Sequence, residues 1–463
     1  MERVLYWFKE ISKIPRGSGN TDAIADFCCN FAKERNFWVR RDFFNNVIIK
    51  KSGTKGYESA APVILQGHTD MVCAKDPDVE FDFFNDGIKI LEKDGYLTAD
   101  GTTLGADNGI AVAMILALLE SDLPHPPVEA ILTSDEEIGL IGAIGLDTAD
   151  IIGRKMINLD SEDVTTFTVS CAGGVVAEAC IPLTERAFNG KKYKISISGL
   201  QGGHSGVEIH KGNANANVLM SRILNELGDV GVISLYGGEK DNVITSAATA
   251  EIVSSIDITS KVGMLADEIS SEYREQGMYI ECIEQDEFSG VAYDSSFAGF
   301  LFTAPNGVLA MSYDIPGLVK TSVNMGIVRI SDGKLKASFS VRSSVESEKA
   351  LTLKKISALT HAFGGSVTES GDYPGWDFNP DSEFLYLMKD SYSELFGTEP
   401  KIEAIHAGLE CGVFAGKLPG LECVSIGPDA LDIHSTAERV SLESIEKCWT
   451  LVKEVLKRSS KCK

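Results

Sequence analysis

The sequence lacks several features that would place it in common protein classes. No apolar run approaches the roughly 20 residues of a membrane-spanning helix, and charges near the N-terminus interrupt the apolar core of a signal peptide. No Gly-x-x-x-x-Gly-Lys-Ser/Thr loop occurs, and no Gly-x-Gly-x-x-Gly follows a predicted strand, so neither common nucleotide-binding loop is expected. A cytoplasmic location is therefore the expectation.

Basic residues are few compared with acidic ones. The chain has 43 Lys and Arg against 67 Asp and Glu, a formal net charge of -24. Nucleic-acid binding depends on Lys/Arg surfaces, so this composition argues against it. The ten cysteines include no Cys-x-x-Cys spacing, which predicts buried, reduced thiols rather than a zinc or redox motif.

The length of the chain predicts more than one domain. With 463 residues, 44% of them hydrophobic, it exceeds one ordinary core. In the first third, predicted helices alternate with continuous apolar strands, which is typical of an α/β sheet covered on both faces. The predicted strands are 47–50, 63–66, 128–133 and 155–159, and the predicted helices are 4–14, 22–35 and 109–120.

The pattern changes near residue 185 and returns near residue 381. Between these points, two rounds of half-buried strands and helices predict an α+β lobe of two ferredoxin-like units. The predicted organisation is a first α/β segment at 1–186, an inserted lobe at 187–378 and a second α/β segment at 379–463. The inserted lobe explains why the two α/β segments lie far apart in the sequence.

His68-Thr69-Asp70, at the end of an apolar strand, is the most informative motif. On a strand, residues i and i+2 point the same way, so Asp70 is expected beside the His68 ring, holding its tautomer while the imidazole binds a metal. Further candidate ligands follow other strands or precede a helix: Asp107, Glu136-Glu137, Asp160 and His434. In open α/β sheets, ligands gather beyond the carboxyl ends of strands. The pattern therefore predicts a two-metal site.

Such a site activates water. Two metals roughly 3.5–4 Å apart that share a carboxylate lower the pKa of a bound water toward about 7. Glu136 would accept the proton of that water as it attacks a carbonyl and would pass it to the leaving amine. Each motif also has a plainer explanation, since a lone His at a strand end is usually structural and Asp-Asn-Gly is usually a turn. Their occurrence together favours the metal site.

The motifs resemble those of the M20 metallopeptidases, most closely the aminoacyl-histidine (Xaa-His) dipeptidases. The segments that carry the resemblance are His-Thr-Asp, Gly-Ala-Asp-Asn-Gly, Ser-Asp-Glu-Glu-Ile-Gly, Asn-Leu-Asp-Ser-Glu-Asp, Asp-Ile-His-Ser-Thr-Ala-Glu, Ile11 to Asn20, Gly202 to Gly206 with Asn213 to Asn217, and His406 to Gly412. The resemblance implies a zinc-peptidase-like three-layer catalytic domain with an inserted lid. It covers nearly the whole chain.

The resemblance also implies roles for single residues. One zinc would be bound by His68, Asp107 and Asp160, and the other by Asp107, Glu137 and His434, with Co²⁺ or Mn²⁺ as other metals that suit the set. Glu136 would be the general base and Asp70 the residue that orients His68. A cis peptide would join Asp107 and Asn108.

Further residues are implied as contacts of the substrate. His204 would help stabilise the tetrahedral oxyanion, and Asn242 and Arg342 would bind the substrate's backbone or terminal carboxylate. His406 and Glu410 would contact substrate near the metals. The oligomeric state stays open, because one chain could supply every lid contact or a homodimer partner could supply His204.

Together, these expectations describe a dizinc dipeptidase. It would cleave the peptide bond of short peptides with a free N-terminus, including Xaa-His dipeptides, by attack of a metal-bridging hydroxide. Two alternatives remain: a tripeptidase or N-acyl-amino-acid amidohydrolase of the same fold, and a non-catalytic descendant that binds peptides. No partner of the nucleic-acid or membrane type is expected.

Overall fold

The computed structural model describes residues 1–459, which divide into two compact units. Unit 1 consists of Met1–Ser170, Phe378–Ala404 and the described residues from Leu409 onward, and unit 2 consists of Cys171–Asp377 and Ile405–Gly408. Unit 2 begins before the boundary predicted after residue 186, because β9 (Gly173–Pro182) pairs with β16 and β17 in the sheet of unit 2. Among the described helices, none is long and apolar enough to cross a membrane.

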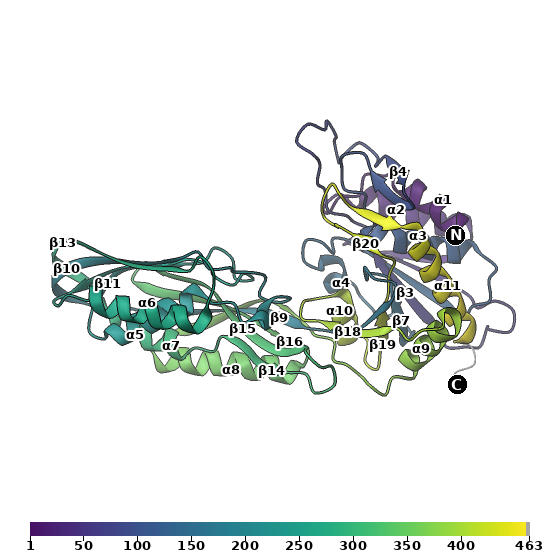
Figure 1. The fold of residues 1–463 in the computed structure, drawn as a ribbon. Coiled ribbons are helices and arrows are strands. Elements are labelled where there is room, and N and C mark those ends of the chain that lie inside the picture. The colour runs from purple at the N-terminus through teal and green to yellow at the C-terminus, as the bar shows by residue number, and fades with distance from the viewer. Residues whose placement is uncertain (460–463) are drawn as a thin grey trace. The chain divides into compact units, whose positions relative to one another are not determined.

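An eight-stranded sheet forms the centre of unit 1 (Figure 1). Its order is β1 (Trp38–Arg41), β2 (Val47–Lys51), β6 (Val128–Thr133), β3 (Val63–His68), β7 (Lys155–Asn158), β19 (Glu422–Ser425), β8 (Thr166–Cys171) and β18 (Lys401–Ile405). Strands β6, β3, β7 and β19 run parallel, so their carboxyl ends lie at one edge. Every residue of β3 and β6 is buried, as the continuous apolar runs predict.

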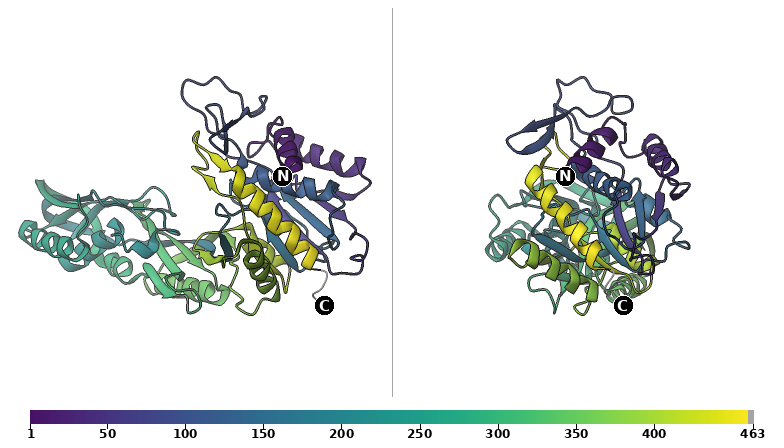
Figure 2. Two further views of the ribbon diagram at one scale, coloured as in Figure 1. Left: turned by 45° about the vertical axis from the view of Figure 1, so that its right-hand side comes forward. Right: turned by 90° about the vertical axis from the view of Figure 1, so that its right-hand side faces the viewer.

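The helices of unit 1 pack around this sheet. They are α1 (Glu2–Ile11), α2 (Asp22–Glu34), α3 (Ala106–Glu120), α4 (Ile141–Gly145), α9 (Glu383–Phe396), α10 (Glu410–Lys417) and α11 (Leu442–Arg458). Helix α3 is apolar on all sides and contacts both α1 and β3, which explains its nearly complete burial. Helix α11, whose apolar side is buried, contacts α9 and lies along the sheet (Figure 2).

A smaller four-stranded sheet completes unit 1. It consists of β20 (Ala430–Leu431), β21 (Arg439–Ser441), β5 (Tyr96–Ala99) and β4 (Ile90–Lys93). The loop between β20 and β21 carries His434, and β21 holds that loop by pairing with β5. A candidate ligand is thereby fixed by strands that are distant in sequence.

Unit 2 contains two ferredoxin-like units, one nested in the other. The inner one is β10 (Glu185–Ser198), α5 (Ala216–Leu227), β11 (Gly231–Gly237), β12 (Ala248–Ser254), α6 (Thr259–Tyr273) and β13 (Tyr279–Asp294). The outer one is β9, α7 (Ala298–Thr303), β15 (Val319–Ser331), β16 (Lys334–Ser343), α8 (Glu346–Ala362) and β17 (Ser366–Tyr373). Strand β14 (Gly307–Met311) pairs with β15, and short 3-10 turns lie at Ile209–Lys211 and Ser295–Phe297.

Strand pairing supports this description. In the inner unit β13 pairs with β10, β10 with β12, and β12 with β11, all antiparallel. In the outer unit β17 pairs with β9, β9 with β16, and β16 with β15. Both sets follow the same strand order, and a contiguous apolar core of unit 2 lies beneath them. The predicted α+β lobe with ferredoxin-like units is confirmed.

Candidate metal centre

The five predicted ligands of the metal centre all lie in unit 1, at the edge where the parallel strands end. His68 is the last residue of β3, and Glu137 follows β6. Asp160 follows β7, and His434 lies in the loop beyond β19. Asp107 stands in the first turn of α3, and the peptide bond that joins it to Asn108 is cis, as predicted.

Asp107 lies between the two histidines. Its Oδ1 is 3.1 Å from His68 Nε2, and its Oδ2 is 3.2 Å from His434 Nε2. His68 Nε2 is also 3.3 Å from Asp160 Oδ1, and His434 Nε2 is 3.0 Å from Glu137 Oε2. Two ligand atoms bound to one tetrahedral zinc at about 2.0–2.2 Å lie about 3.3–3.6 Å apart. The spacing is thus close to that of two ligand sets that share Asp107, and His68, Asp107 and Glu137 form a cluster able to hold a metal ion.

The charges of this cluster favour a cation. Burial raises the pKa of Asp160 to about 6, and the neighbouring Asp107 and Glu137 carboxylates add to the rise. Hydrogen bonds to Asp107 and Glu137 raise the pKa of His434 to about 10. For Asp107, burial acts to raise the pKa, but hydrogen bonds with His434 and His68 lower it overall. The carboxylates therefore favour positive charge at this point. In place of protons on the imidazoles, a divalent metal ion bound by neutral imidazoles would balance the same carboxylates.

Asp70 holds the edge of the site together. It is fully buried, and its Oδ1 lies 3.3 Å from His68 Nδ1. Its carboxylate also accepts hydrogen bonds from Ser18 Oγ at 2.8 Å and from the backbone N–H groups of Glu136 at 3.1 Å and Glu137 at 3.3 Å. One carboxylate therefore faces the imidazole of His68 and fixes the loop that carries Glu136 and Glu137.

Glu136 directly precedes the candidate ligand Glu137, and its surroundings perturb its pKa. Burial raises its pKa well above the ordinary value, His68 opposes the rise, and the carboxylates of Asp160, Glu410 and Glu137 reinforce it. A carboxylate of raised pKa is a stronger base near neutral pH. A raised pKa is the direction of shift expected of a carboxylate that takes a proton from a water molecule.

Glu438 supports the loop that carries Asp107. The sequence motifs predicted no role for it. Only 2% of it is exposed. Its Oε2 accepts hydrogen bonds from the N–H groups of Leu104 at 2.7 Å and Gly105 at 2.9 Å, and its Oε1 from those of Ala106 at 2.8 Å and Asp107 at 3.3 Å. The only signal in the sequence was its position at the end of the Asp-Ile-His-Ser-Thr-Ala-Glu motif.

Arg16 is a second supporting residue without a predicted role. Its buried guanidinium donates hydrogen bonds to the carbonyl oxygens of Thr69 at 3.0 Å and Asp70 at 3.2 Å and to that of Gly105. Arg16 thereby joins the segment after β3 to the segment before α3. Its place in the quoted motif from Ile11 to Asn20 was the available signal.

Glu410 was expected to contact substrate, and the structure buries it at the start of α10. It is 1% exposed, and its Oε2 accepts hydrogen bonds from Thr133 Oγ1 at 2.8 Å and from Gln66 Nε2. Burial raises its pKa to about 8. Gln66 Oε1 accepts from Asn158 Nδ2, so the network continues beneath the strand ends. Glu410 therefore lies in a buried hydrogen-bond network with Gln66 and Thr133, near the ends of β3 and β6.

The other predicted substrate contacts lie in unit 2. His406 is buried, with its Nε2 2.7 Å from Ser322 Oγ, and burial together with Arg342 lowers its pKa to about 3. Arg342, on β16, donates to the hydroxyl of Tyr373 at 2.9 Å. These side chains form one polar cluster of unit 2 that contains a neutral imidazole beside a fixed guanidinium.

His204 and Asn242 lie close to each other in the same unit. His204 Nδ1 accepts hydrogen bonds from the N–H groups of Gly206 at 3.1 Å and Val207 at 3.2 Å, which leaves Nε2 for another partner. The carbonyl oxygen of Asn242 accepts from the N–H of Ser205 at 2.9 Å. Burial and the charge of Arg342 lower the pKa of His204, which favours the neutral ring.

Comparison with known proteins places these features in a family. Residues 64–458 match peptidase family M20/M25/M40. The chain is 35% identical to the cytosol non-specific dipeptidase of Escherichia coli (strain K12) over 97% of this chain and 96% of that protein.

Solved structures agree with that assignment. The crystal structure of aminoacylhistidine dipeptidase from Vibrio alginolyticus superposes with a TM-score of 0.91 at 34% identity, covering 98% of this chain and 96% of that one. Aminopeptidase PepT from Bacillus cereus shares the fold, with a TM-score of 0.59 at 18% identity over 99% of this chain and 98% of that one. The chain belongs to peptidase family M20/M25/M40.

Proposed function

We propose that the protein is a dizinc dipeptidase that acts on short peptides with a free N-terminus, Xaa-His dipeptides among them. The observation that carries the proposal is the position of Asp107, whose two carboxylate oxygens lie 3.1 and 3.2 Å from imidazole nitrogens of His68 and His434. A carboxylate shared in this way is the usual bridge of a two-metal hydrolase. The similarity to the dipeptidases of Escherichia coli and Vibrio alginolyticus over nearly the whole chain supports the substrate class and a cytoplasmic location.

Each proposed zinc site has three protein ligands. His68, Asp107 and Asp160 would hold one ion, and Asp107, Glu137 and His434 the other. Imidazole nitrogen and carboxylate oxygen suit Zn²⁺, and Co²⁺ or Mn²⁺ would fit the same set. When bound, the ions would supply a nucleophilic water at neutral pH and polarise the scissile carbonyl.

The protein's own groups would move the proton and position the substrate. Glu136, with its raised pKa, would take a proton from the attacking water and return it to the departing amine. Asp70 would keep His68 Nδ1 protonated and Nε2 free for metal. In unit 2, His204, Asn242, Arg342 and His406 are proposed to contact the substrate, while Glu410 would act from beneath the strand ends.

A substrate panel with metal analysis tests the proposal. The purified protein would be incubated with Ala-Ala, Ala-His, Ala-Ala-Ala and N-acetyl-alanine, and its zinc content would be measured in parallel. We expect about two zinc ions per chain and hydrolysis of both dipeptides, abolished by a chelator and restored by Zn²⁺. Preference for the tripeptide or the N-acetyl compound would point to the alternative enzymes of this fold. Peptide binding without hydrolysis by the zinc-loaded protein would identify a non-catalytic descendant.

A further inference from the structure

A cavity of about 390 Å³ opens on unit 1 beside the candidate metal centre. Its lining is Gly17, Ser18, Asn20, Cys73, Phe81, Asp82, Phe83 and Phe84. The volume lies within the roughly 300–1,000 Å³ of small-molecule sites. None of these residues is a proposed metal ligand, and Ser18 contacts the site through its hydrogen bond to Asp70.

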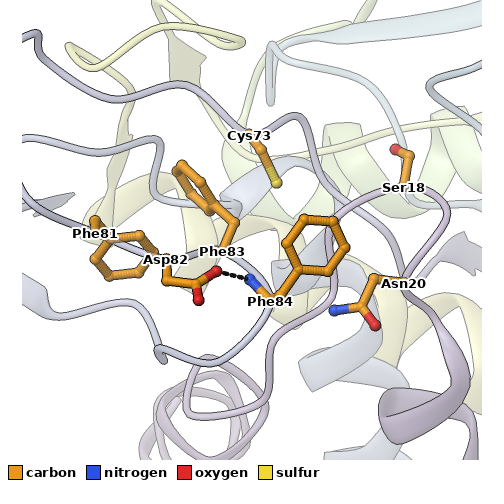
Figure 3. A pocket seen from close by; sticks show the side chains of 8 residues that line it. Ser18, Asn20, Cys73, Phe81, Asp82, Phe83 and Phe84 are labelled. Carbon is orange, nitrogen blue, oxygen red and sulfur yellow. Dashed lines mark hydrogen bonds between the residues drawn. The ribbon is translucent and has the colours of Figure 1, made fainter.

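The lining of the cavity is mainly aromatic. The rings of Phe81 and Phe83 meet edge to face, with their centroids 4.7 Å apart. Phe84 is 73% exposed, and Figure 3 shows the Cys73 thiol pointing between the rings of Phe83 and Phe84. Burial raises the pKa of this thiol, which therefore adds an uncharged wall. An exposed phenylalanine beside a hollow offers apolar contact to a ligand.

The carboxylate in the cavity wall serves its own loop. Asp82 Oδ1 accepts the N–H of Phe84 at 2.9 Å, and its Oδ2 accepts Asn85 Nδ2 at 2.7 Å (Figure 3 draws the first of these bonds). These bonds fix the turn that presents the aromatic rings. Recognition in the cavity therefore rests on apolar contact, with Ser18 and Asn20 as polar groups at one side (Figure 3).

Two hydrogen bonds join the cavity wall to Asp70 and Asp135, which lie next to the candidate ligands. Ser18 Oγ donates to Asp70 Oδ2 at 2.8 Å, and the same carboxylate accepts the N–H groups of Glu136 and Glu137. The N–H of Gly19 donates to Asp135 Oδ1 at 2.7 Å, directly before Glu136. Backbone pairing of Gly17 with Met71 places the wall alongside the segment that follows His68. These contacts connect the cavity wall to the loop that carries Glu136 and Glu137.

We infer that this cavity receives an apolar, preferably aromatic, side chain of the peptide substrate and so contributes to side-chain preference. The inference rests on the proposed dipeptidase function. A peptide whose scissile carbonyl lies at the metal centre would place a flanking side chain on the side of Ser18 and Gly19, which contact Asp70 and Asp135, and the aromatic wall would meet that side chain. Burying an aromatic side chain against Phe83 and Phe84 strengthens binding of substrates that carry one, while a methyl side chain gains little.

Kinetics with matched dipeptides test this site. Wild type, Phe84→Ala, Phe84→Leu and the control Phe43→Ala would be loaded with zinc, checked for zinc content and melting temperature, and assayed on Phe-Ala, Ala-Phe and Ala-Ala. Phe43 is 94% exposed and lies outside the cavity lining, so it is a matched control.

We expect Phe84→Ala to lower kcat/KM about 10-fold for one of the two phenylalanine dipeptides, while that for Ala-Ala changes less than about 2-fold. The affected dipeptide identifies which substrate residue enters the cavity. Phe84→Leu should keep most of the preference, and Phe43→Ala all of it. An unchanged ratio of phenylalanine to alanine substrates in Phe84→Ala, with Ala-Ala still hydrolysed, overturns the cavity assignment alone. A zinc-loaded wild type that hydrolyses none of the three overturns the proposed function and the assignment with it.

Alkylation of Cys73 provides an independent measurement. Iodoacetamide forms a bond from sulfur to carbon with loss of iodide and of the thiol proton, and it leaves a carboxamidomethyl group in the cavity. Treated wild type should lose activity toward the affected phenylalanine dipeptide more than toward Ala-Ala, whereas Cys73→Ala treated in the same way should not. Equal losses in both proteins would contradict the assignment.

Discussion

Replacing Glu438 by Gln should disturb the metal centre although Glu438 is not a proposed ligand. Its carboxylate accepts four backbone N–H groups between Leu104 and Asp107, two on each oxygen. Glutamine replaces one of these oxygens with a donor, so two buried N–H groups lose their acceptor. Each such loss costs about 1–3 kcal/mol, which amounts to roughly 2–6 kcal/mol for the pair. The Asp107 loop would shift, and the buried guanidinium of Arg16 would lose a negative charge that faces it.

Two measurements check this expectation. The metal-free variant should melt on the order of 5–10 °C below wild type, and its zinc affinity, from competition with a chelator, should fall about 10–100-fold. Glu443→Gln is the control, because Glu443 has 78% of its side chain exposed and forms a surface ion pair with Lys447. If Glu438→Gln melts within a degree of wild type and binds zinc equally well, the four hydrogen bonds do not support the Asp107 loop as argued.

Three further predictions concern single side chains. Glu136→Gln should keep its zinc but lose about 100- to 10,000-fold in kcat, and near-normal hydrolysis by this variant would remove Glu136 from the base role. His204→Ala should lower kcat far more than zinc content, and a variant with less zinc but normal turnover per zinc pair would speak against a substrate contact. In the folded protein the pKa of His406 is about 3, below the usual 6.5. As the pH falls, the unfolded chain therefore binds a proton at His406 that the folded protein does not bind. The stability contribution of His406 is therefore complete above about pH 6.5, and it falls by up to about 1.4 kcal/mol per pH unit below that. His406→Gln should flatten the fall in melting temperature between pH 7 and 5. Parallel curves of melting temperature against pH for wild type and variant would contradict the assignment.

The sequence was most informative where function and sheet topology coincide. His68, Glu137 and Asp160 follow apolar strands, and parallel strands bring such positions to one edge, so their grouping follows from the order of elements alone. His434 could be added because the α/β pattern returns after the insertion. The ferredoxin-like lobe was predictable from its half-buried strands, as the pairing of β10 and β16 with their neighbours confirms.

Other features depend on contacts that leave no local pattern. Glu438 binds backbone N–H groups more than three hundred residues away, and any exposed glutamate would look the same in the sequence. Glu410 is buried against Gln66 and Thr133, and this burial follows from where α10 begins. Strand β13 carries little local signal, because most of its residues are partly or fully exposed, which removes the apolar alternation that marks a strand.

The nesting of the two ferredoxin-like units sets an order of events on the ribosome. Strand β9 leaves the exit tunnel before any of β10 to β13, yet its partners β16 and β17 are translated only after that whole block. The inner repeat has all six of its elements in one uninterrupted stretch and so can collapse while synthesis continues, whereas β9 must wait with its hydrogen-bonding edges unfilled. During that interval β9 is a stretch of nascent polypeptide that chaperones would need to shield from aggregation.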